Sequence, residues 1–336
     1  MVAVGARLSA RTSTPIRAQG GFGRYPDAVR ARAPASTANL GPGFDVLALA
    51  LNLSVEVEVE PASRLIVRAE GEGADLADDA GHLAARVAID VAGHDRLAIT
   101  VRSDIPVARG LGSSAALAVA AAAAAGSKDP LGVAARIDGH PDNAAASVVG
   151  GLVGATLVKG SVRAVRLPLD PGLVFVVVVP ERPLATSKAR QALPQQVARA
   201  DATFNLGRMA MLLAGLADRS LLTREAAEDR LHQDYRSPMF PEAPQLLSRL
   251  VTAGALASCW SGAGPSLLGI CDAGSGERVR DRAEAALVEL GVAGRAMVLL
   301  PDLEGLVVDG APGFVGRNKG AGGAGTQAPF DLLAGD

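Results

Sequence analysis

Apolar and polar residues alternate over several short segments of the chain, and this two-residue period is typical of half-buried β-strands. Residues 51–60 give the clearest case, with valines at 55, 57 and 59 on one face and glutamates at 56, 58 and 60 on a solvated face. The segment at 173–179 is so rich in valine that we expect both of its faces to be covered. Similar patterns predict strands at residues 29–34, 65–69, 97–101, 150–153, 255–260, 267–271 and 294–300.

Helical patterns fall between these strands. They predict helices at residues 81–92, 113–125, 131–137, 142–148, 187–192, 202–216, 224–233, 244–252 and 276–290. The helix at 113–125 is apolar nearly all round, so we expect it to be buried. The interleaved elements predict an α+β fold with a mostly antiparallel sheet. The 336 residues are enough for two domains, and we place their boundary near residue 170.

Both ends of the chain lack this periodicity. Residues 1–28 carry four arginines and one aspartate but no apolar stretch, so secretion is disfavoured. We expect a disordered extension or a misassigned start codon there, with a transit-like presequence as the alternative. The glycine-rich residues 311–336 are expected to form a disordered tail.

Composition narrows the functional classes. Hydrophobic residues make up 49% and charged residues 20% of the chain, and its net charge is −2. This balance gives no basic field for a nucleic acid or an anionic membrane, and no apolar run approaches the roughly 20 residues of a transmembrane helix. Two cysteines, Cys259 and Cys271, fit no metal spacing. We expect buried, inert thiols in a cytoplasmic protein.

A glycine-serine turn that leads into the apolar helix is the first candidate for chemistry. Its eleven residues are Pro106, Val107, Ala108, Arg109, Gly110, Leu111, Gly112, Ser113, Ser114, Ala115 and Ala116. Glycines allow the backbone to approach a bound group, and a helix start offers free N–H donors, so we expect an anion here. Our hypothesis is that the turn holds the phosphates of ATP. It matches neither GxxxxGK[ST] nor a GxGxxG that follows a strand and opens a helix.

Three other stretches depart from ordinary loop composition: Asn39–Asp45, Gly139–Asn143 and Ser261–Ser266. Each stretch alone could be an ordinary turn between two secondary-structure elements. These three stretches, the PxxxGLGSSAA motif of the turn and residues His232–Arg236 together resemble the motifs of homoserine kinases in the GHMP small-molecule kinase superfamily. The resemblance covers about residues 29–300.

The resemblance implies a two-domain α+β fold with the active site in the cleft. Residues 29–170 would form the N-terminal, ATP-binding domain with a left-handed βαβ crossover, and residues 171–310 a ferredoxin-like C-terminal domain. The implied reaction is transfer of the γ-phosphoryl group from MgATP to the side-chain hydroxyl of L-homoserine, for threonine biosynthesis.

The chemistry of the substrate gives these residues a rationale. An amino acid is a zwitterion, so its site needs a cation for the carboxylate, and arginine suits this task because its planar fork makes two parallel hydrogen bonds. By resemblance, Arg190 and Arg236 take the carboxylate, while Asp45 holds the ammonium with Asn39 beside it. A surface charge is the alternative for each arginine. The remaining residues that the resemblance implies at the substrate are His140, Asn143, Thr186 and Gly262.

Catalysis of phosphoryl transfer depends mainly on positioning and charge neutralisation. By resemblance, backbone N–H groups from Gly112 to Ala115 cradle the phosphates, the Ser114 hydroxyl is a magnesium ligand, and Asn143 and His140 lie at the reacting hydroxyl. We expect no strong general base. His82 stands where the family often has an asparagine near the adenine, and a surface histidine is the alternative.

One departure concerns magnesium. Many homoserine kinases have an acidic residue eight positions before the motif histidine, and this chain has Gly132 there. Asp129 or Asp138 could replace it, or Mg²⁺ could rest on Ser114, ATP and water. Gly132 leaves open the alternative of a catalytically silent ligand-binding protein. A separate alternative is another GHMP kinase, for mevalonate, phosphomevalonate, shikimate or a sugar. A homodimer is also left open.

Overall fold

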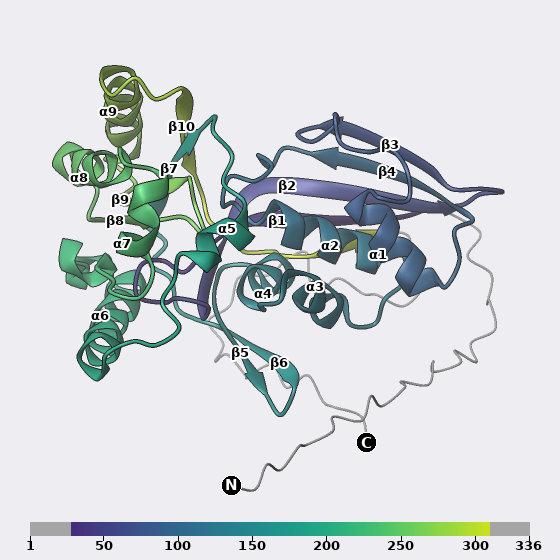
Figure 1. Ribbon diagram of the computed structural model, residues 1–336, viewed down its shortest axis with the longest axis horizontal. Helices are drawn as coiled ribbons and strands as arrows, with labels where there is room; N and C mark the ends of the chain where they lie inside the picture. The colour runs from purple at the N-terminus through teal and green to yellow at the C-terminus, as the bar shows by residue number, and fades with distance from the viewer. Residues whose placement is uncertain (1–27, 310–336) are drawn as a thin grey trace, which may run out of the picture.

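The computed structural model describes residues 28–309 and contains two β-sheets, each with helices packed against it (Figure 1). The expected N-terminal extension, apart from residue 28, and the expected C-terminal tail lie outside the described residues. Within residues 28–309, no helix has both the length and the apolar character needed to cross a bilayer.

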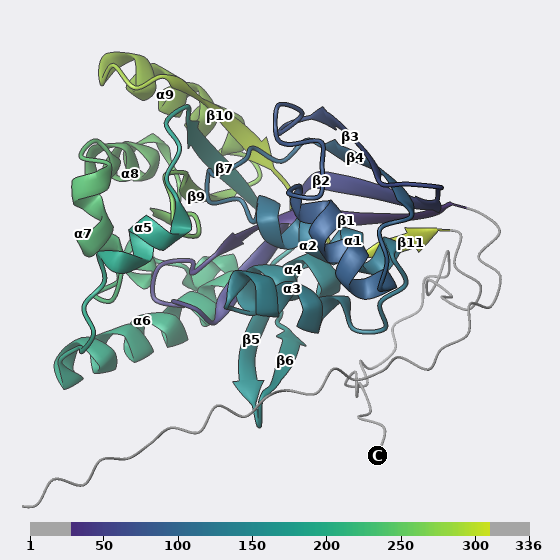
Figure 2. The ribbon, with the colours of Figure 1, turned by 45° about the vertical axis from the view of Figure 1, so that its right-hand side comes forward.

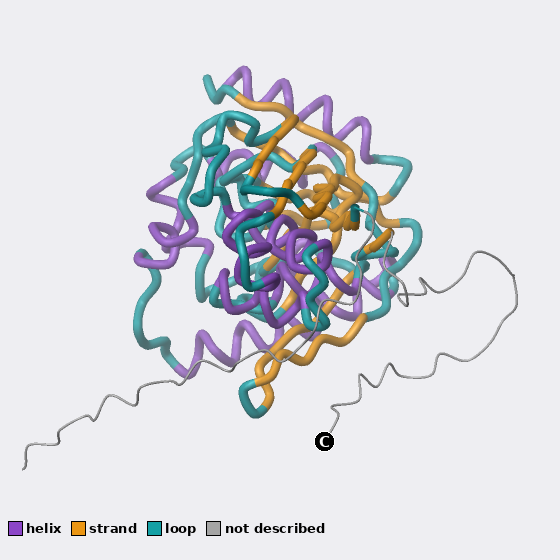
Figure 3. The backbone as a smooth tube through the Cα atoms, turned by 90° about the vertical axis from the view of Figure 1, so that its right-hand side faces the viewer, coloured by secondary structure: helices purple, strands orange, loops and turns teal. Residues whose placement is uncertain are grey.

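The first sheet has seven strands, in the order β11-β1-β2-β4-β3, with β5 paired to β2 and β6 paired to β5. Its strands are β1 (Val29–Ala38), β2 (Leu47–Pro61), β3 (Ile66–Gly71), β4 (Leu97–Ser103), β5 (Leu152–Val158), β6 (Ser161–Arg166) and β11 (Val307–Asp309). All pairs are antiparallel except β3 with β4. The hairpin of β5 and β6 projects away from the rest of the sheet in each view (Figures 1 and 3).

The long strand β2 confirms the alternation seen in the sequence. The valines at 55, 57 and 59 are buried, and the intervening glutamates face outward. Glu56 and Glu58 form ion pairs with Arg30 on β1 and Arg102 on β4. Cross-strand pairs of opposite charge therefore line the polar face of this sheet.

The helices of the first half are α1 (Leu83–Ala92), α2 (Ser113–Ala124), α3 (Pro130–Asp138) and α4 (Asp142–Val149). Helices α2 and α4 pack directly on β1 and β2 and cover one face of the sheet (Figure 1). Helix α2 is buried over nearly its whole length, as predicted, and its many alanines allow close packing against strands and neighbouring helices. Its N-terminus is thereby fixed beside the end of β1.

The second sheet is antiparallel, in the order β10-β7-β9-β8. Its strands are β7 (Leu173–Pro180), β8 (Ala257–Trp260), β9 (Leu267–Asp272) and β10 (Gly294–Leu299). The helices of this half are α5 (Thr186–Gln191), α6 (Arg199–Ala217), α7 (Gln233–Arg236), α8 (Ala243–Ala253) and α9 (Gly276–Glu289), with 3₁₀ turns η1 (Arg219–Leu221), η2 (Arg224–Ala227) and η3 (Ser237–Met239). This is a split β-α-β arrangement of the ferredoxin-like kind.

Strand β7 is buried along its entire length, which confirms that both faces of the second sheet are covered. Val174, Val176 and Val178 pack in the cluster that contains α8 and α9 residues. Phe175 and Val177 belong to the larger core cluster that also contains first-sheet residues. The two sheets therefore share a continuous apolar core. Cys259 and Cys271 are free and buried in it, and burial raises the pKa of each thiol to about 12.

The predicted helix at residues 224–233 is wrong. Only the short turn η2 forms there, and helix α7 begins at Gln233. The reason is Asp229, whose carboxylate accepts hydrogen bonds from the backbone N–H groups of Leu231, His232 and Gln233. Such local side-chain bonds compete with helical ones.

Two short strands were not predicted. Strand β6 is largely exposed, so its sequence carries little apolar signal. Strand β11 pairs with β1, and it therefore returns the chain to the first sheet (Figure 2).

Candidate active site

The glycine-serine turn lies between β4 and α2, against the second sheet's Ser261–Ser266 loop. Gly110 has a φ of 76°, and a Cβ at this position would lie 2.3 Å from the carbonyl oxygen of Ser261. The Ser261 hydroxyl donates to the Gly110 carbonyl at 2.7 Å and contacts the Thr37 hydroxyl of β1 at 2.9 Å. Only glycine allows this approach, because any side chain would collide with backbone.

Gly112 is the N-cap of α2 and also has a left-handed backbone, with a φ of 64°. It provides no side-chain cap, and the first backbone bond of the helix runs from Ala116 N–H to the Gly112 carbonyl at 2.9 Å. The N–H groups of residues 113–115 therefore have no helical acceptor, and the helix dipole adds a partial positive charge. This donor set fits phosphate oxygens.

Ser114 is exposed on the first turn of α2, and its hydroxyl donates to Asp138 Oδ1 at 2.9 Å. Burial raises the pKa of the Asp138 carboxyl, and the bond from Ser114 opposes this shift. Asp129 instead caps α3 by accepting from the Gly132 N–H at 2.8 Å. Of the two carboxylates considered as replacements for residue 132, Asp138 is therefore the one that stands beside Ser114.

Asn143 lies on the first turn of α4, and its side-chain amide is held at both ends. The Ser36 hydroxyl of β1 donates to Asn143 Oδ1 at 2.9 Å, and Asn143 Nδ2 donates to Asp142 Oδ1 at 3.3 Å. Asp142 Oδ1 also accepts from the Asn143 N–H at 2.6 Å. Burial raises the pKa of the Asp142 carboxyl to about 6.

The Asn39–Asp45 loop is held in an unusual backbone form, with positive φ at Asn39, Leu40 and Asp45. Asn39 Oδ1 accepts from the Asp45 N–H at 3.0 Å, and Asn39 Nδ2 donates to the Gly262 carbonyl at 2.7 Å. The loop is therefore fastened to the Ser261–Ser266 loop of the second sheet.

Three charged side chains gather around Phe44. Arg190 Nη1 donates to Asp45 Oδ2 at 3.0 Å, and Arg190 Nη2 makes a second bond to Oδ1. The guanidinium carbons of Arg190 and Arg236 each lie 5.7 Å from the Phe44 ring centre. Arg236 is 1% exposed, and burial, followed by the nearby Arg190 cation, lowers its pKa to about 10.

This cluster has more positive than negative charge, because Asp45 pairs with Arg190 while Arg236 makes no ion pair within residues 28–309. The Nε atoms of both arginines are buried and lack a hydrogen-bond partner there. Buried donors of this kind favour an anionic ligand.

Three other predicted residues are placed differently. His140 lies near enough to the cluster for the charges of Arg190 and Asp45 to act on it. Burial lowers the pKa of His140, Arg190 lowers it further, and Asp45 raises it. Thr186 is exposed at the start of α5 and makes no hydrogen bond to the other predicted site residues of the described chain. His82 is buried, so the alternative of a surface histidine is wrong, and its Nδ1 caps α1 at Ala84 N–H.

A cavity of about 500 Å³ adjoins the turn on the side of residues 106–109. Its other walls come from the β3–α1 connection, the end of β7 and the start of β10. Arg295 of β10 closes one edge by pairing with Glu72 at 3.1 Å.

The structure brings the predicted loops together through residues to which the sequence motifs gave no role. Ser36 and Thr37 were not singled out, although polar residues inside the Ala-rich end of β1 were a usable signal, and Ser261 stood inside a predicted motif without a role of its own. Phe44 stood inside a predicted motif without a role of its own.

Several known proteins resemble this chain in sequence and in fold. The GHMP kinases N terminal domain matches residues 80–151, and the GHMP kinases C terminal domain matches residues 212–289. The chain is 40% identical over 295 residues to a homoserine kinase of Streptomyces coelicolor, covering 82% of this chain and 95% of that protein. It is 40% identical over 292 residues to a homoserine kinase of Moorella thermoacetica, covering 82% and 98%. The crystal structure of homoserine kinase from Cytophaga hutchinsonii superposes with a TM-score of 0.74 at 27% identity, covering 85% and 99%.

Proposed function

The chain belongs to the homoserine kinases, a branch of the GHMP kinase family, and we propose that it phosphorylates the side-chain hydroxyl of L-homoserine with ATP. The observation that carries the choice of substrate is the cluster of Asp45, Arg190 and Arg236 around Phe44. It offers one carboxylate and two guanidinium groups, with one positive charge in excess.

A zwitterionic amino acid matches this arrangement. Its ammonium would pair with Asp45 while Asn39 holds that loop, and its carboxylate would bind the forks of Arg190 and Arg236. Mevalonate, shikimate and sugars lack an ammonium group, so binding any of them would leave Asp45 without a cationic ligand group.

The phosphate end is supplied by the turn. The N–H groups of residues 113–115 would bind the phosphates of ATP, and the cavity beside residues 106–109 would receive its nucleoside. His82, the other residue expected at the nucleotide, does not line this cavity, and its ring caps α1.

Magnesium fits Ser114 and Asp138, which present a hydroxyl and a carboxylate together. Within residues 28–309, no group of three or more His, Cys, Asp and Glu side chains could hold a metal. Mg²⁺ commonly keeps several waters, so two protein oxygens suffice alongside phosphate oxygens. When bound, the ion neutralises charge on the transferred phosphate.

In the reaction, the hydroxyl oxygen of homoserine forms a bond to the γ-phosphorus while the bond from that phosphorus to the β,γ-bridging oxygen breaks, releasing ADP. Asn143 would orient the hydroxyl, because its amide is fixed by Ser36 and Asp142. His140 and Thr186 would line the substrate. The hydroxyl proton leaves to phosphate or solvent, since phosphoryl transfer asks mainly for positioning.

Several broader features are part of this proposal. They are a left-handed β3–α1–β4 crossover, a domain division near residue 170, a place in threonine biosynthesis and a cytoplasmic location. A homodimer stays open.

A coupled assay of ADP release tests the proposal, with homoserine, mevalonate, shikimate and galactose as acceptors. We expect ADP release with homoserine alone. Release with another acceptor would reassign the substrate, and release with none would favour a silent binding protein. Asn143→Ala should lower turnover while sparing ATP binding, and wild-type turnover in that variant would overturn its assigned role.

A further inference from the structure

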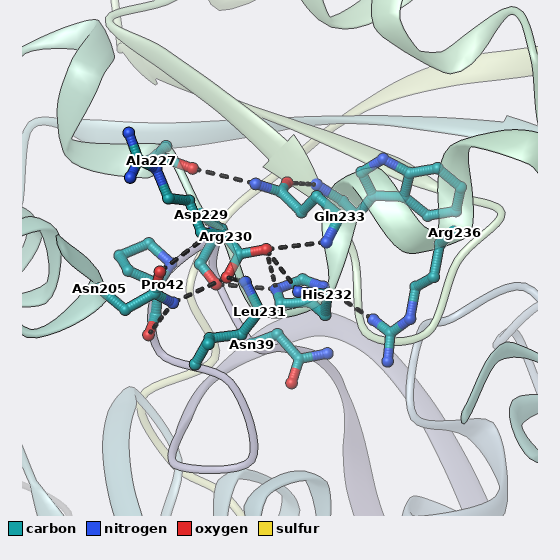
Figure 4. A network of polar contacts seen from close by, with 12 residues as sticks. Asn39, Pro42, Asn205, Ala227, Asp229, Arg230, Leu231, His232, Gln233 and Arg236 are labelled. Carbon is teal, nitrogen blue, oxygen red and sulfur yellow. Dashed lines mark hydrogen bonds and ion pairs between the residues drawn. The ribbon is translucent and has the colours of Figure 1, made fainter. Parts of the chain in front are cut away.

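The segment from Asp229 to Arg236 forms a buried polar network, of which only Arg236 has a role in the proposed reaction (Figure 4). Asp229 organises its start. One carboxylate oxygen accepts from the His232 and Gln233 N–H groups, at 2.8 Å each, and the other from Asn205 Nδ2 at 2.7 Å. These donors hold the non-helical residues 229–232, which lead into α7, in a fixed conformation.

His232 is the centre of the network and is completely buried. Its Nε2 lies 2.8 Å from the Gly41 carbonyl oxygen, and its Nδ1 lies 2.9 Å from Arg236 Nη1. A carbonyl oxygen only accepts and a guanidinium only donates, so Nε2 must carry the proton while Nδ1 accepts. The partners thus define one neutral tautomer.

The electrostatic surroundings support the neutral form. Burial lowers the pKa of His232 to about 4, with Arg236 lowering it further and Asp229, the Gly41 carbonyl and Asp45 acting in the opposite direction. An imidazolium would also present an N–H toward a guanidinium that has no acceptor to offer.

The network connects the two parts of the amino acid site. Gly41 belongs to the Asn39–Asp45 loop, and the His232 ring stacks on Phe44 with ring centres 5.2 Å apart. Arg236 Nη1 bonds both His232 and the Gly262 carbonyl, the latter at 3.0 Å. These two acceptors fix one end of the guanidinium, while its Nε is buried without a partner.

We propose that His232 is a positioning residue whose neutral imidazole, fixed by the Gly41 carbonyl, aims the Arg236 guanidinium at the carboxylate of the amino acid substrate. The inference rests on the proposed function. It predicts that His232 acts on the carboxylate of the ligand and on no other part of it.

The test compares wild type with His232→Ala and His232→Gln. Two quantities are measured: the KM for homoserine and the inhibition constant of 3-aminopropan-1-ol, which has the ammonium and hydroxyl but no carboxylate. Loss of one hydrogen bond to a charged group should raise the KM on the order of tenfold or more in His232→Ala. The inhibition constant of the amino alcohol, the KM for ATP and kcat should stay within about twofold, because only the carboxylate contact is weakened.

His232→Gln provides the rescue. Its amide can donate to Gly41 and accept from Arg236, so the KM should return toward the wild-type value. Ser258→Ala, which removes a hydroxyl bonded to the Leu247 carbonyl, is the control for loss of an internal hydrogen bond elsewhere in the same half.

An equal weakening of homoserine and 3-aminopropan-1-ol in the His232 variants would overturn the inference, as would an unchanged KM in folded His232→Ala. If His232→Ala does not fold, the same comparison in His232→Gln decides, since a rise confined to the KM for homoserine supports positioning and an equal rise in both constants refutes it. Failure of wild type to release ADP with homoserine would instead overturn the proposed function.

Discussion

Gly112→Ala should damage stability and turnover together, because Gly112 lies against Ser36 and against the Asn143 amide that Ser36 holds. With a φ of 64°, an alanine here would place its Cβ 2.1 Å from Ser36 Oγ and 3.0 Å from Asn143 Oδ1. The Ser36 hydroxyl would have to move, and its 2.9 Å bond to Asn143 would break.

The magnitude follows from two contributions. A left-handed backbone costs a non-glycine residue ~1–2 kcal/mol, and the lost hydrogen bond costs about 0.5–1.5 kcal/mol. The free energy of unfolding should therefore fall by ~2–3 kcal/mol. If freeing the Asn143 amide removes about 1.4 kcal/mol of transition-state stabilisation, kcat falls on the order of tenfold.

Gly93→Ala is the matched control. Gly93 ends α1 with a φ of 75°, and a Cβ there would meet nothing within 4 Å. It should show the backbone cost alone, ~1–2 kcal/mol, with unchanged kcat. Urea unfolding and steady-state rates measure both variants.

The compensating variant removes the obstructing oxygen. The double variant Gly112→Ala/Ser36→Ala should lose ~1 kcal/mol less free energy of unfolding than the sum of the losses in the two single variants, because both substitutions remove the same hydrogen bond. The reasoning is refuted if Gly112→Ala matches Gly93→Ala in both stability and kcat.

Three further predictions concern carboxylates of the site. Asp138→Asn should weaken Mn²⁺ binding, measured by calorimetry with a non-hydrolysable ATP analogue, by about tenfold, whereas Asp129→Asn, which can still cap α3, should not; equal affinities in both would exclude Asp138 as a ligand. Asp45→Asn should raise the KM for homoserine by about tenfold or more, with the KM for ATP unchanged; an unchanged homoserine KM contradicts its pairing with the ammonium. Burial raises the pKa of Asp142 from 3.8 to about 6, so the folded protein retains a proton that the unfolded chain loses, and stability should fall as pH rises from about 4 to about 6. Asp142→Asn should remove this fall, gaining up to ~3 kcal/mol over wild type between pH 4 and pH 7; a pH-independent difference in urea unfolding would refute it.

Much of the fold could be predicted because apolar periodicity reports burial. In strands β2 and β7 and in helix α2, the apolar residues of the sequence are the ones that are buried in the structure. The failures have physical causes. Residues 224–233 look helical, but the Asp229 carboxylate captures three successive N–H groups, and composition does not reveal that competition.

The site could be predicted only as a set of loops. Glycines and serines predicted the turn at residues 106–116, and the family resemblance assigned roles to residues inside each motif. Contacts between motifs could not be predicted from the sequence, because Ser36 and Asn143 are 107 residues apart in the chain and Ser114 and Asp138 are 24 residues apart. The resemblance points to position 132 for a magnesium carboxylate and leaves Asp129 and Asp138 as replacements, and in the structure the carboxylate beside Ser114 is that of Asp138.

These contacts between motifs also predict that the proposed sites for the amino acid and for the phosphate are coupled. The loop between β1 and β2 carries Asp45 and helix α4 carries Asn143, while the second half of the chain carries Arg190, Arg236 and the Gly262 carbonyl, so neither half of the chain holds the complete proposed site. The halves are fastened where backbones touch, by Ser261 to the Gly110 carbonyl at 2.7 Å and by Gly262 N–H to the Ala38 carbonyl at 3.0 Å. A shift of about 1 Å at either contact would separate the hydroxyl of the amino acid from the phosphate, and misplacement on this scale can lower a rate about a hundredfold. In the proposed site, we therefore expect substitution of the small residues in the three loops to lower turnover as well as to disturb packing.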